Sequence, residues 1–277
     1  MQHIAVTLLY YAISVDPTIL VNLVTLSSQQ SKSPEQTYDA TMWLLNYSDS
    51  NPNATIRYTT SDMILYVHSD TSYLSATRAQ SRAGGHYFLS YRSPDPTNPC
   101  RTRLRLNGTI HTMSKIMSNI MGSNAKAKIG ATYINGQETA PILTLLCKLG
   151  HHQTATPIQV DSSTTVVVVN DTIKQKRSKA IDMCFYWILD RTSRCQFLVY
   201  WQPGITNLAD YHKKQHLPDH HSLMRSTYLH PTEQLANTVI ALLLRGCVNP
   251  PIRAFPVQHH TIKPPSVLLP FGVLPLT

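Results

Sequence analysis

Three aspartates stand at positions where a folded chain could bring their carboxylates together. Asp70 and Asp161 each follow an apolar run that predicts a buried strand, and Asp210 opens a segment that predicts a helix. Carboxylate oxygens gathered in this way are the ligands that Mg²⁺ prefers. Two such ions can hold the attacking and leaving oxygens of a phosphodiester during hydrolysis. Aspartate also ends strands and caps helices in proteins without a metal site, so the pattern alone leaves both interpretations open.

The elements that must position these aspartates follow a helical N-terminal region. Three helices are predicted there, over residues 1–15, 17–29 and 33–47. Asp16-Pro17 separates the first two, because proline suits the first turn of a helix and Asp16 can cap it. In the third helix Ala40, Trp43 and Leu44 stand at helical spacing, so we expect these side chains to be buried together.

From Thr55 onward the pattern changes to strands interspersed with helices. Strands are predicted over residues 63–68, 84–91, 109–114, 157–161, 180–188 and 196–201. Helices are predicted over residues 122–148 and 207–214, and less regularly over 231–244. Residues 162–170 are ambiguous between strand and helix, since a run of valines favours a strand but the position after a strand favours a helix. This order predicts an α+β fold, a mixed sheet with helices on its faces.

The net charge is positive chiefly because acids are scarce. The chain has 24 Lys and Arg against 15 Asp and Glu, a formal net charge of +9, although only 14% of its residues are charged. A basic protein favours a polyanionic partner such as nucleic acid, whose phosphates it neutralises. The alternative is a soluble protein that is basic without such a partner.

The cysteines and the N-terminal apolar stretch bear on the cellular compartment. Five cysteines without a C-x-x-C pair argue against a disulfide framework and for a reducing environment. The N-terminal stretch from Ile4 to Leu26 is apolar, but Asp16-Pro17 divides it into halves that are too short to span a bilayer. We therefore expect a cytoplasmic or nuclear protein that is neither secreted nor bound to a membrane.

Eight short motifs occur in a fixed order within residues 1–216. They cover residues 1–17, 37–47, 65–70, 82–88, 109–115, 158–162, 176–182 and 208–214. For example, Leu65-Tyr-Val-His-Ser-Asp70 is similar to Y-x-D-A-D-W, and Leu208-Ala-Asp-Tyr-His-Lys-Lys214 is similar to L-A-D-x-x-T-K. In this order the motifs resemble copia-type retrotransposon Pol polyproteins, from the end of the reverse transcriptase into the ribonuclease H domain.

The resemblance implies a ribonuclease H-like mixed β-sheet flanked by helices, preceded by a small helical thumb remnant. Residues 1–54 would be the reverse-transcriptase thumb or connection remnant, and residues 55–216 the ribonuclease H-like domain. Residues 217–277 would be a Pro-rich C-terminal extension, largely disordered. The polymerase active site, with its own paired aspartates, has no counterpart in this sequence.

The family's activity is hydrolysis of the RNA strand of an RNA–DNA hybrid by two Mg²⁺ ions. By resemblance, Asp70, Asp161 and Asp210 would be the catalytic residues and the metal ligands. Contacts with nucleic acid are implied for Lys115, Arg177, Lys179 and Lys214. No small-molecule cofactor is implied.

Several residues depart from the family's pattern at this site. The family's catalytic glutamate, in S-S-A-E-A-E-Y, is replaced by Lys128, while Ser72 and Lys213 stand where the family has Asp and Thr. A charged ammonium has no lone pair to give to a metal, and two cations would repel it. We expect Lys128 to pair instead with Asp70 or Asp161 and to impair hydrolysis. Three hypotheses follow: an impaired ribonuclease H, a non-catalytic nucleic-acid-binding module, or a non-functional relic of a transposable element.

Overall fold

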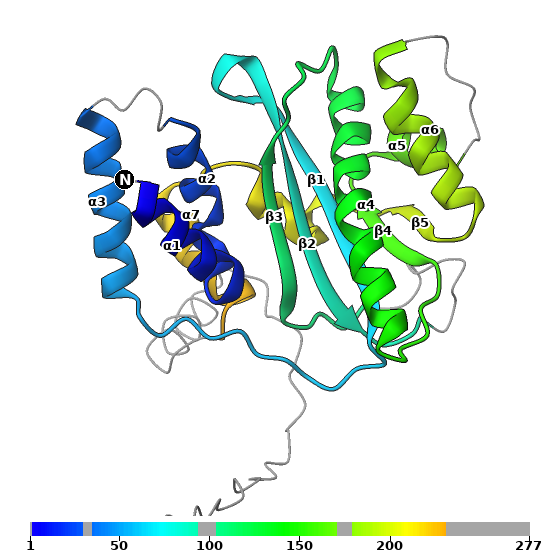
Figure 1. Ribbon diagram of the computed structural model, residues 1–277, viewed down its shortest axis with the longest axis horizontal. Helices are drawn as coiled ribbons and strands as arrows, with labels where there is room; N and C mark the ends of the chain where they lie inside the picture. Colours follow the sequence, from blue (N-terminus) through cyan, green and yellow to red (C-terminus); the bar gives the residue numbers. More distant parts are fainter. Residues whose placement is uncertain (1, 30–34, 94–103, 171–178, 231–277) are drawn as a thin grey trace, which may run out of the picture. The chain divides into compact units, whose positions relative to one another are not determined.

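A five-stranded mixed sheet forms the centre of the fold (Figure 1). The computed structural model describes residues 2–29, 35–93, 104–170 and 179–230. The strands are β1 (Ile64–Ala76), β2 (Gln80–Ser90), β3 (Thr109–Ile116), β4 (Thr156–Val160) and β5 (Phe197–Trp201). Their order across the sheet is β3-β2-β1-β4-β5. The first three strands are antiparallel, and β4 and β5 run parallel to β1. The expected α+β fold with a mixed β-sheet is thereby confirmed.

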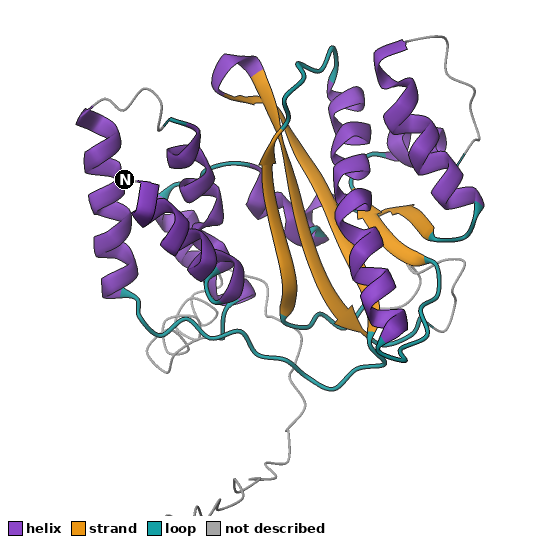
Figure 2. Cartoon of the chain, in the orientation of Figure 1, coloured by secondary structure: helices purple, strands orange, loops and turns teal. Residues whose placement is uncertain are grey.

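The helices lie around this sheet (Figure 2). The α-helices are α1 (Gln2–Ser14), α2 (Leu20–Ser28), α3 (Glu35–Ser50), α4 (Asn124–Lys148), α5 (Ser163–Val169), α6 (Lys179–Ser193) and α7 (Pro218–Tyr228). Short 3₁₀ helices are η1 (Pro17–Ile19), η3 (Thr77–Ala79), η5 (Gly204–Thr206) and η6 (Leu208–Lys213). Among the described residues, none of these helices combines the length and apolarity needed to cross a membrane.

Two adjacent glycines of β2 show which element covers each face of the sheet. A Cβ at Gly84 would lie 2.6 Å from the Ala209 carbonyl oxygen of η6, and one at Gly85 would lie 2.0 Å from the Asn135 side chain of α4. Because successive strand residues point to opposite faces, α4 covers one face and η6 the other. Neither element could approach so closely over a larger residue.

The main core lies on the α4 face of the sheet. Fully buried side chains include Leu65 and Val67 of β1, Ile129 of α4, Ile158 of β4 and Phe197 of β5. On β1, Leu65 and Val67 alternate with Ile64 and Tyr66, which pack with Phe88 in a second apolar cluster. Apolar residues on both faces explain why this strand is a continuous apolar run in the sequence.

The N-terminal helices have a core of their own. Leu8, Ile19, Leu23 and Leu44 are buried together. As predicted, Asp16 caps the turn that begins at Pro17, accepting a hydrogen bond from the Thr18 amide at 3.0 Å. Asp16 also forms an ion pair with Arg225 of α7 at 3.3 Å. The C-terminal extension expected from residue 217 therefore begins with a helix that contacts the N-terminal region. The described residues, which end at His230, belong to one compact unit.

Some elements differ from the sequence-based expectations. The strand predicted over 180–188 is wrong, since these residues belong to α6, where Phe185 and Ile188 are buried at helical spacing. The ambiguous segment 162–170 forms α5. On α3 only Leu44 of the three expected side chains is buried, since Ala40 and Trp43 are exposed. The helix predicted over 231–244 lies outside the described residues.

Candidate functional site

Asp70 and Asp161 stand at matching places on two neighbouring strands. The parallel register of β1 and β4 pairs Val67 with Ile158, and each aspartate follows three residues later. Neighbouring strands lie about 4.8 Å apart, so this register brings the two carboxyl groups to the same end of the sheet. The Asp70 side chain is fully buried, whereas 21% of the Asp161 side chain is exposed.

Asp210 reaches this place because η6 is fastened to β1. The Asn207 side chain caps η6 by accepting from the Ala209 amide at 3.0 Å, and it donates to the Ser69 carbonyl oxygen at 3.0 Å. The Leu208 amide donates to Nδ1 of His68, also at 3.0 Å. These bonds hold the first turn of η6 against β1 immediately before Asp70.

Lys213 joins two of the three aspartates. Its Nζ donates to Oδ2 of Asp70 at 2.7 Å and also pairs with Asp210, three residues earlier in η6. The Ser72 hydroxyl donates to the Lys213 carbonyl oxygen at 2.5 Å, which fixes the backbone that carries this lysine. Asp70 and Asp210 therefore share one ammonium group.

Lys128 supplies a second ammonium group. It lies near the start of α4, where Ser123 caps the helix by accepting from the Lys126 amide. Its Nζ forms an ion pair with Oδ1 of Asp161, one of the two partners expected from the sequence. Only 16% of the Lys128 side chain is exposed. Two lysines thus lie among three aspartates at one end of the sheet.

The charges of this cluster influence one another. Burial raises the pKa of Asp70, an effect that the Lys213 ammonium opposes and the Asp161 charge reinforces. Burial also acts to raise the pKa of Asp210, but the hydrogen bond and charge of Lys213 lower it overall. For Lys213 burial acts to lower the pKa, and the two carboxylates raise it overall. Lys213 is accordingly charged at neutral pH.

The residues present do not fit a pair of divalent cations. No group of three or more His, Cys, Asp or Glu side chains in the described part of the chain is arranged to hold a metal ion. Two carboxylates that could bind metal are turned towards Lys213 and a third towards Lys128. An ammonium group offers no lone pair and repels a cation. The roles predicted for Asp70, Asp161 and Asp210 as catalytic residues and metal ligands stay predictions.

The residues predicted to contact nucleic acid lie at several places. Lys115 is exposed on β3, and Lys214 is exposed directly after η6. Lys179 begins α6, but its side chain is not described, and Arg177 lies outside the described residues. Sequence reasoning noted Lys213 as a departure without giving it a partner. Its spacing of three residues from Asp210 on a helical turn could have indicated that pair.

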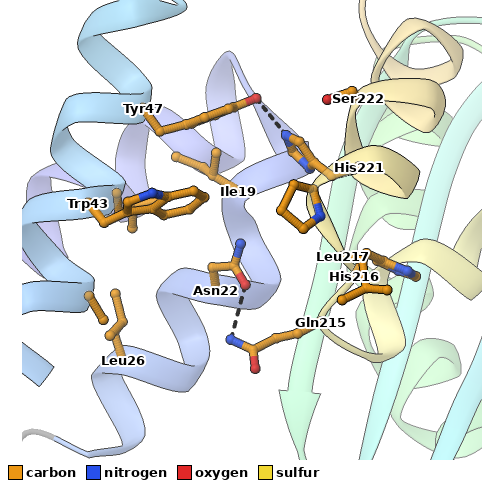
Figure 3. Close-up of a pocket in the computed structure, with 13 residues that line it drawn as sticks. Ile19, Asn22, Leu26, Trp43, Tyr47, Gln215, His216, Leu217, His221 and Ser222 are labelled. Carbon is orange, nitrogen blue, oxygen red and sulfur yellow. Dashed lines mark hydrogen bonds between the residues drawn. The ribbon is translucent and has the colours of Figure 1, made fainter. Parts of the chain in front are cut away.

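A separate cavity of about 750 Å³ lies between the N-terminal helices and the segment that leads into α7 (Figure 3). Trp43 and Tyr47 line it from α3, and Tyr47 forms a hydrogen bond of 2.6 Å with His221 across it. On another side of the cavity, the side-chain amide of Gln215 donates a hydrogen bond to Oδ1 of Asn22 at 3.1 Å. None of the described residues that line it is Asp, Glu, Lys or Arg, so it offers no counterpart to the charged cluster.

No protein-family model matches this sequence, and no curated protein matches it. Similar solved structures include LC11-RNase H1, isolated from compost by a metagenomic approach and determined in complex with an RNA/DNA hybrid. It is 13% identical over 53% of this chain and 91% of its own, with a TM-score of 0.37. RNase H1 from Halobacterium salinarum is 11% identical over 53% of this chain and 90% of its own, with a TM-score of 0.33. Prototype foamy virus protease–reverse transcriptase is 12% identical over 61% of this chain and 21% of its own, with a TM-score of 0.29. At these scores the likenesses carry no inference about the chemistry of this site.

Proposed function

We propose that this chain is a ribonuclease H-like module of a copia-type retrotransposon polyprotein that binds nucleic acid without hydrolysing it. The preferred ligand is an RNA–DNA hybrid, in the cytoplasm or nucleus. The observation that carries the proposal is the pair of lysines among the aspartates: Lys128 on Asp161, and Lys213 on Asp70 and Asp210.

The loss of hydrolysis follows from what these lysines do to the carboxylates. In the family, two Mg²⁺ ions would activate the attacking oxygen and stabilise the leaving oxygen of the phosphodiester. Here Lys213 engages Asp70 and Asp210, and Lys128 stands where a glutamate would complete the ligands. An ammonium group cannot take over that chemistry, because it is not a Lewis acid and cannot lower the pKa of a bound water molecule as a metal ion does.

Binding of nucleic acid is compatible with the same arrangement. Three aspartates alone would repel a phosphate backbone, but Lys128 and Lys213 neutralise two of their three charges. Lys115 and Lys214 are exposed, and the chain carries a net charge of +9. Such a module would recognise the shape and backbone of a hybrid rather than its sequence.

A cleavage assay and a binding assay on the same protein test the proposal. With Mg²⁺ or Mn²⁺, we expect hybrid cleavage no faster than that of the Asp70→Asn variant. We also expect hybrid binding whose affinity falls with salt concentration, with a slope that reports several phosphates. Cleavage above the variant's background would refute the loss of hydrolysis. If no salt-dependent binding of the hybrid is found, the remaining hypothesis is a non-functional relic of a transposable element.

Calorimetry tests the part played by the lysines. The double change Lys128→Glu and Lys213→Thr restores the family's residues and removes both ammonium groups, so we expect this variant to gain Mn²⁺ binding that the original chain lacks. Lys148→Glu, at the exposed end of α4, changes the charge without touching the cluster and should gain none. Equal heats for all three proteins would contradict the explanation.

A further inference from the structure

A second site is indicated by a buried arginine that has no acidic partner. Arg82 lies on β2, between Ser72 of β1 and Ile116 of β3, and is only 4% exposed. None of the ion pairs among the described residues includes it. A buried charge of this kind is costly unless an anion or enough hydrogen bonds compensate it.

The hydrogen bonds of Arg82 satisfy only part of its guanidinium group. One Nη1 proton is donated to the Val21 carbonyl oxygen at 3.2 Å and one Nη2 proton to the Thr25 hydroxyl at 2.8 Å, both on α2. A guanidinium has five N–H donors, so these bonds among the described residues use two of them. Burial also lowers the pKa of Arg82, as expected for a cation without a nearby negative charge.

A cavity of about 220 Å³ lies directly beside this group. Its lining combines Arg82 with hydroxyl-bearing residues of α2, the end of β1 and η3, among them Ser28, Ser75 and Thr77. Lys214 adds a second cation to the lining. The described lining contains no Asp or Glu; besides the two cations it consists of neutral polar residues together with Ala76 and Ile116.

We propose that this cavity binds a phosphate group of the nucleic-acid backbone. Phosphate suits the observed donors, because the remaining N–H groups of the planar guanidinium can give it charge-assisted hydrogen bonds and the Lys214 ammonium supplies a second cation. The inference rests on the proposed function for its ligand, and it adds a contact that the carboxylate cluster does not supply.

The position of the cavity suits a strand that also passes the carboxylate cluster. Lys214 directly follows Lys213, whose Nζ pairs with Asp70, and the Ser72 hydroxyl bonds to the Lys213 carbonyl oxygen. The same short segment therefore borders both places. A phosphodiester strand has regularly spaced phosphates, so one can occupy the cavity while others lie near the cluster.

Titration with inorganic phosphate tests the cavity by itself. We expect the unmodified chain to bind phosphate, and Arg82→Gln and Lys214→Gln each to weaken this binding about tenfold, the loss of one charge-assisted hydrogen bond. Lys148→Gln removes the same charge from the exposed end of α4 and should bind as the unmodified chain does. Lys214 is exposed, so its variant remains informative even if Arg82→Gln does not fold.

The salt dependence of hybrid binding identifies the source of the phosphate. Each lost phosphate contact should make the slope of log K against log salt shallower by about 0.9, in Lys214→Gln and Arg82→Gln but not in Lys148→Gln. Unchanged slopes would overturn the assignment to nucleic acid. If the unmodified chain nevertheless binds inorganic phosphate, the cavity is a site for free phosphate. If the unmodified chain binds no hybrid, the proposed function fails, while the phosphate titration still decides whether the cavity holds an anion.

Discussion

Replacing Lys213 by methionine should destabilise the fold because it leaves a buried carboxylate without its cation. The Lys213 ammonium lies 2.7 Å from Oδ2 of Asp70, whose side chain is fully buried. Removing one partner of a buried ion pair costs about 3–5 kcal/mol, and we expect about 3 kcal/mol here since 15% of the Lys213 side chain is exposed. Asp210, at 40% exposed, can be solvated and contributes little to this loss.

The destabilisation caused by Lys213→Met should depend on pH, because Asp70 carries its charge only in the deprotonated form. Burial already raises the pKa of Asp70 above its unfolded value of 3.8, and loss of Lys213 raises it further. A carboxyl group with a raised folded-state pKa stabilises the fold below its unfolded pKa, and that stability is lost as pH rises through the folded pKa. The destabilisation of Lys213→Met should therefore be larger at neutral pH than near pH 3.8.

Urea unfolding of the two proteins at both pH values measures this difference. Lys148→Met, which changes an exposed lysine at the end of α4, is the matched control and should stay within about 0.5 kcal/mol of the original chain. Adding Asp70→Asn to Lys213→Met should recover part of the lost stability, because no buried charge is then left. A loss that is equal at both pH values, or absent, would refute the interpretation of Lys213 as the buried counter-ion.

Three further outcomes follow from contacts elsewhere in the fold. His86 and His212 stack in the interior, and burial lowers the pKa of His86 to about 3 and that of His212 as well. The free energy of unfolding should therefore decrease as pH drops below 6.5, by about 1.4 kcal/mol per pH unit for each of these histidines. In urea unfolding, His86→Phe should show a smaller decrease over the same pH range. Asn135→Ala should cost about 3 kcal/mol in thermal or urea unfolding, because this buried amide of α4 donates to both β1 and β2, and a loss below about 1 kcal/mol would contradict that role. On α3, Leu44→Ala should cost about 2–4 kcal/mol and Trp43→Ala much less, since Leu44 is 2% and Trp43 59% exposed; equal losses would be inconsistent with this packing.

Much of the local structure could be predicted from single segments. The cap at Asp16, the helix that ends near Lys148 and the apolar run of β1 each depend on residues a few positions apart. The segment 180–188 was mispredicted because aromatic and β-branched side chains favour a strand, whereas packing of Phe185 and Ile188 favours the helix. Local propensity is a weak guide where tertiary contacts compete with it.

The sequence by itself determined the alternation of strands and helices, the scarcity of acids and the lysine at position 128, since all of these are properties of neighbouring residues or of composition. Only the tertiary structure decided which charges meet. Lys213 and Asp70 are 143 residues apart, and Arg82 faces a helix about 60 residues earlier. Such pairs depend on strand register and on close approach over Gly84, and these are set by packing across the whole sheet rather than by any local pattern.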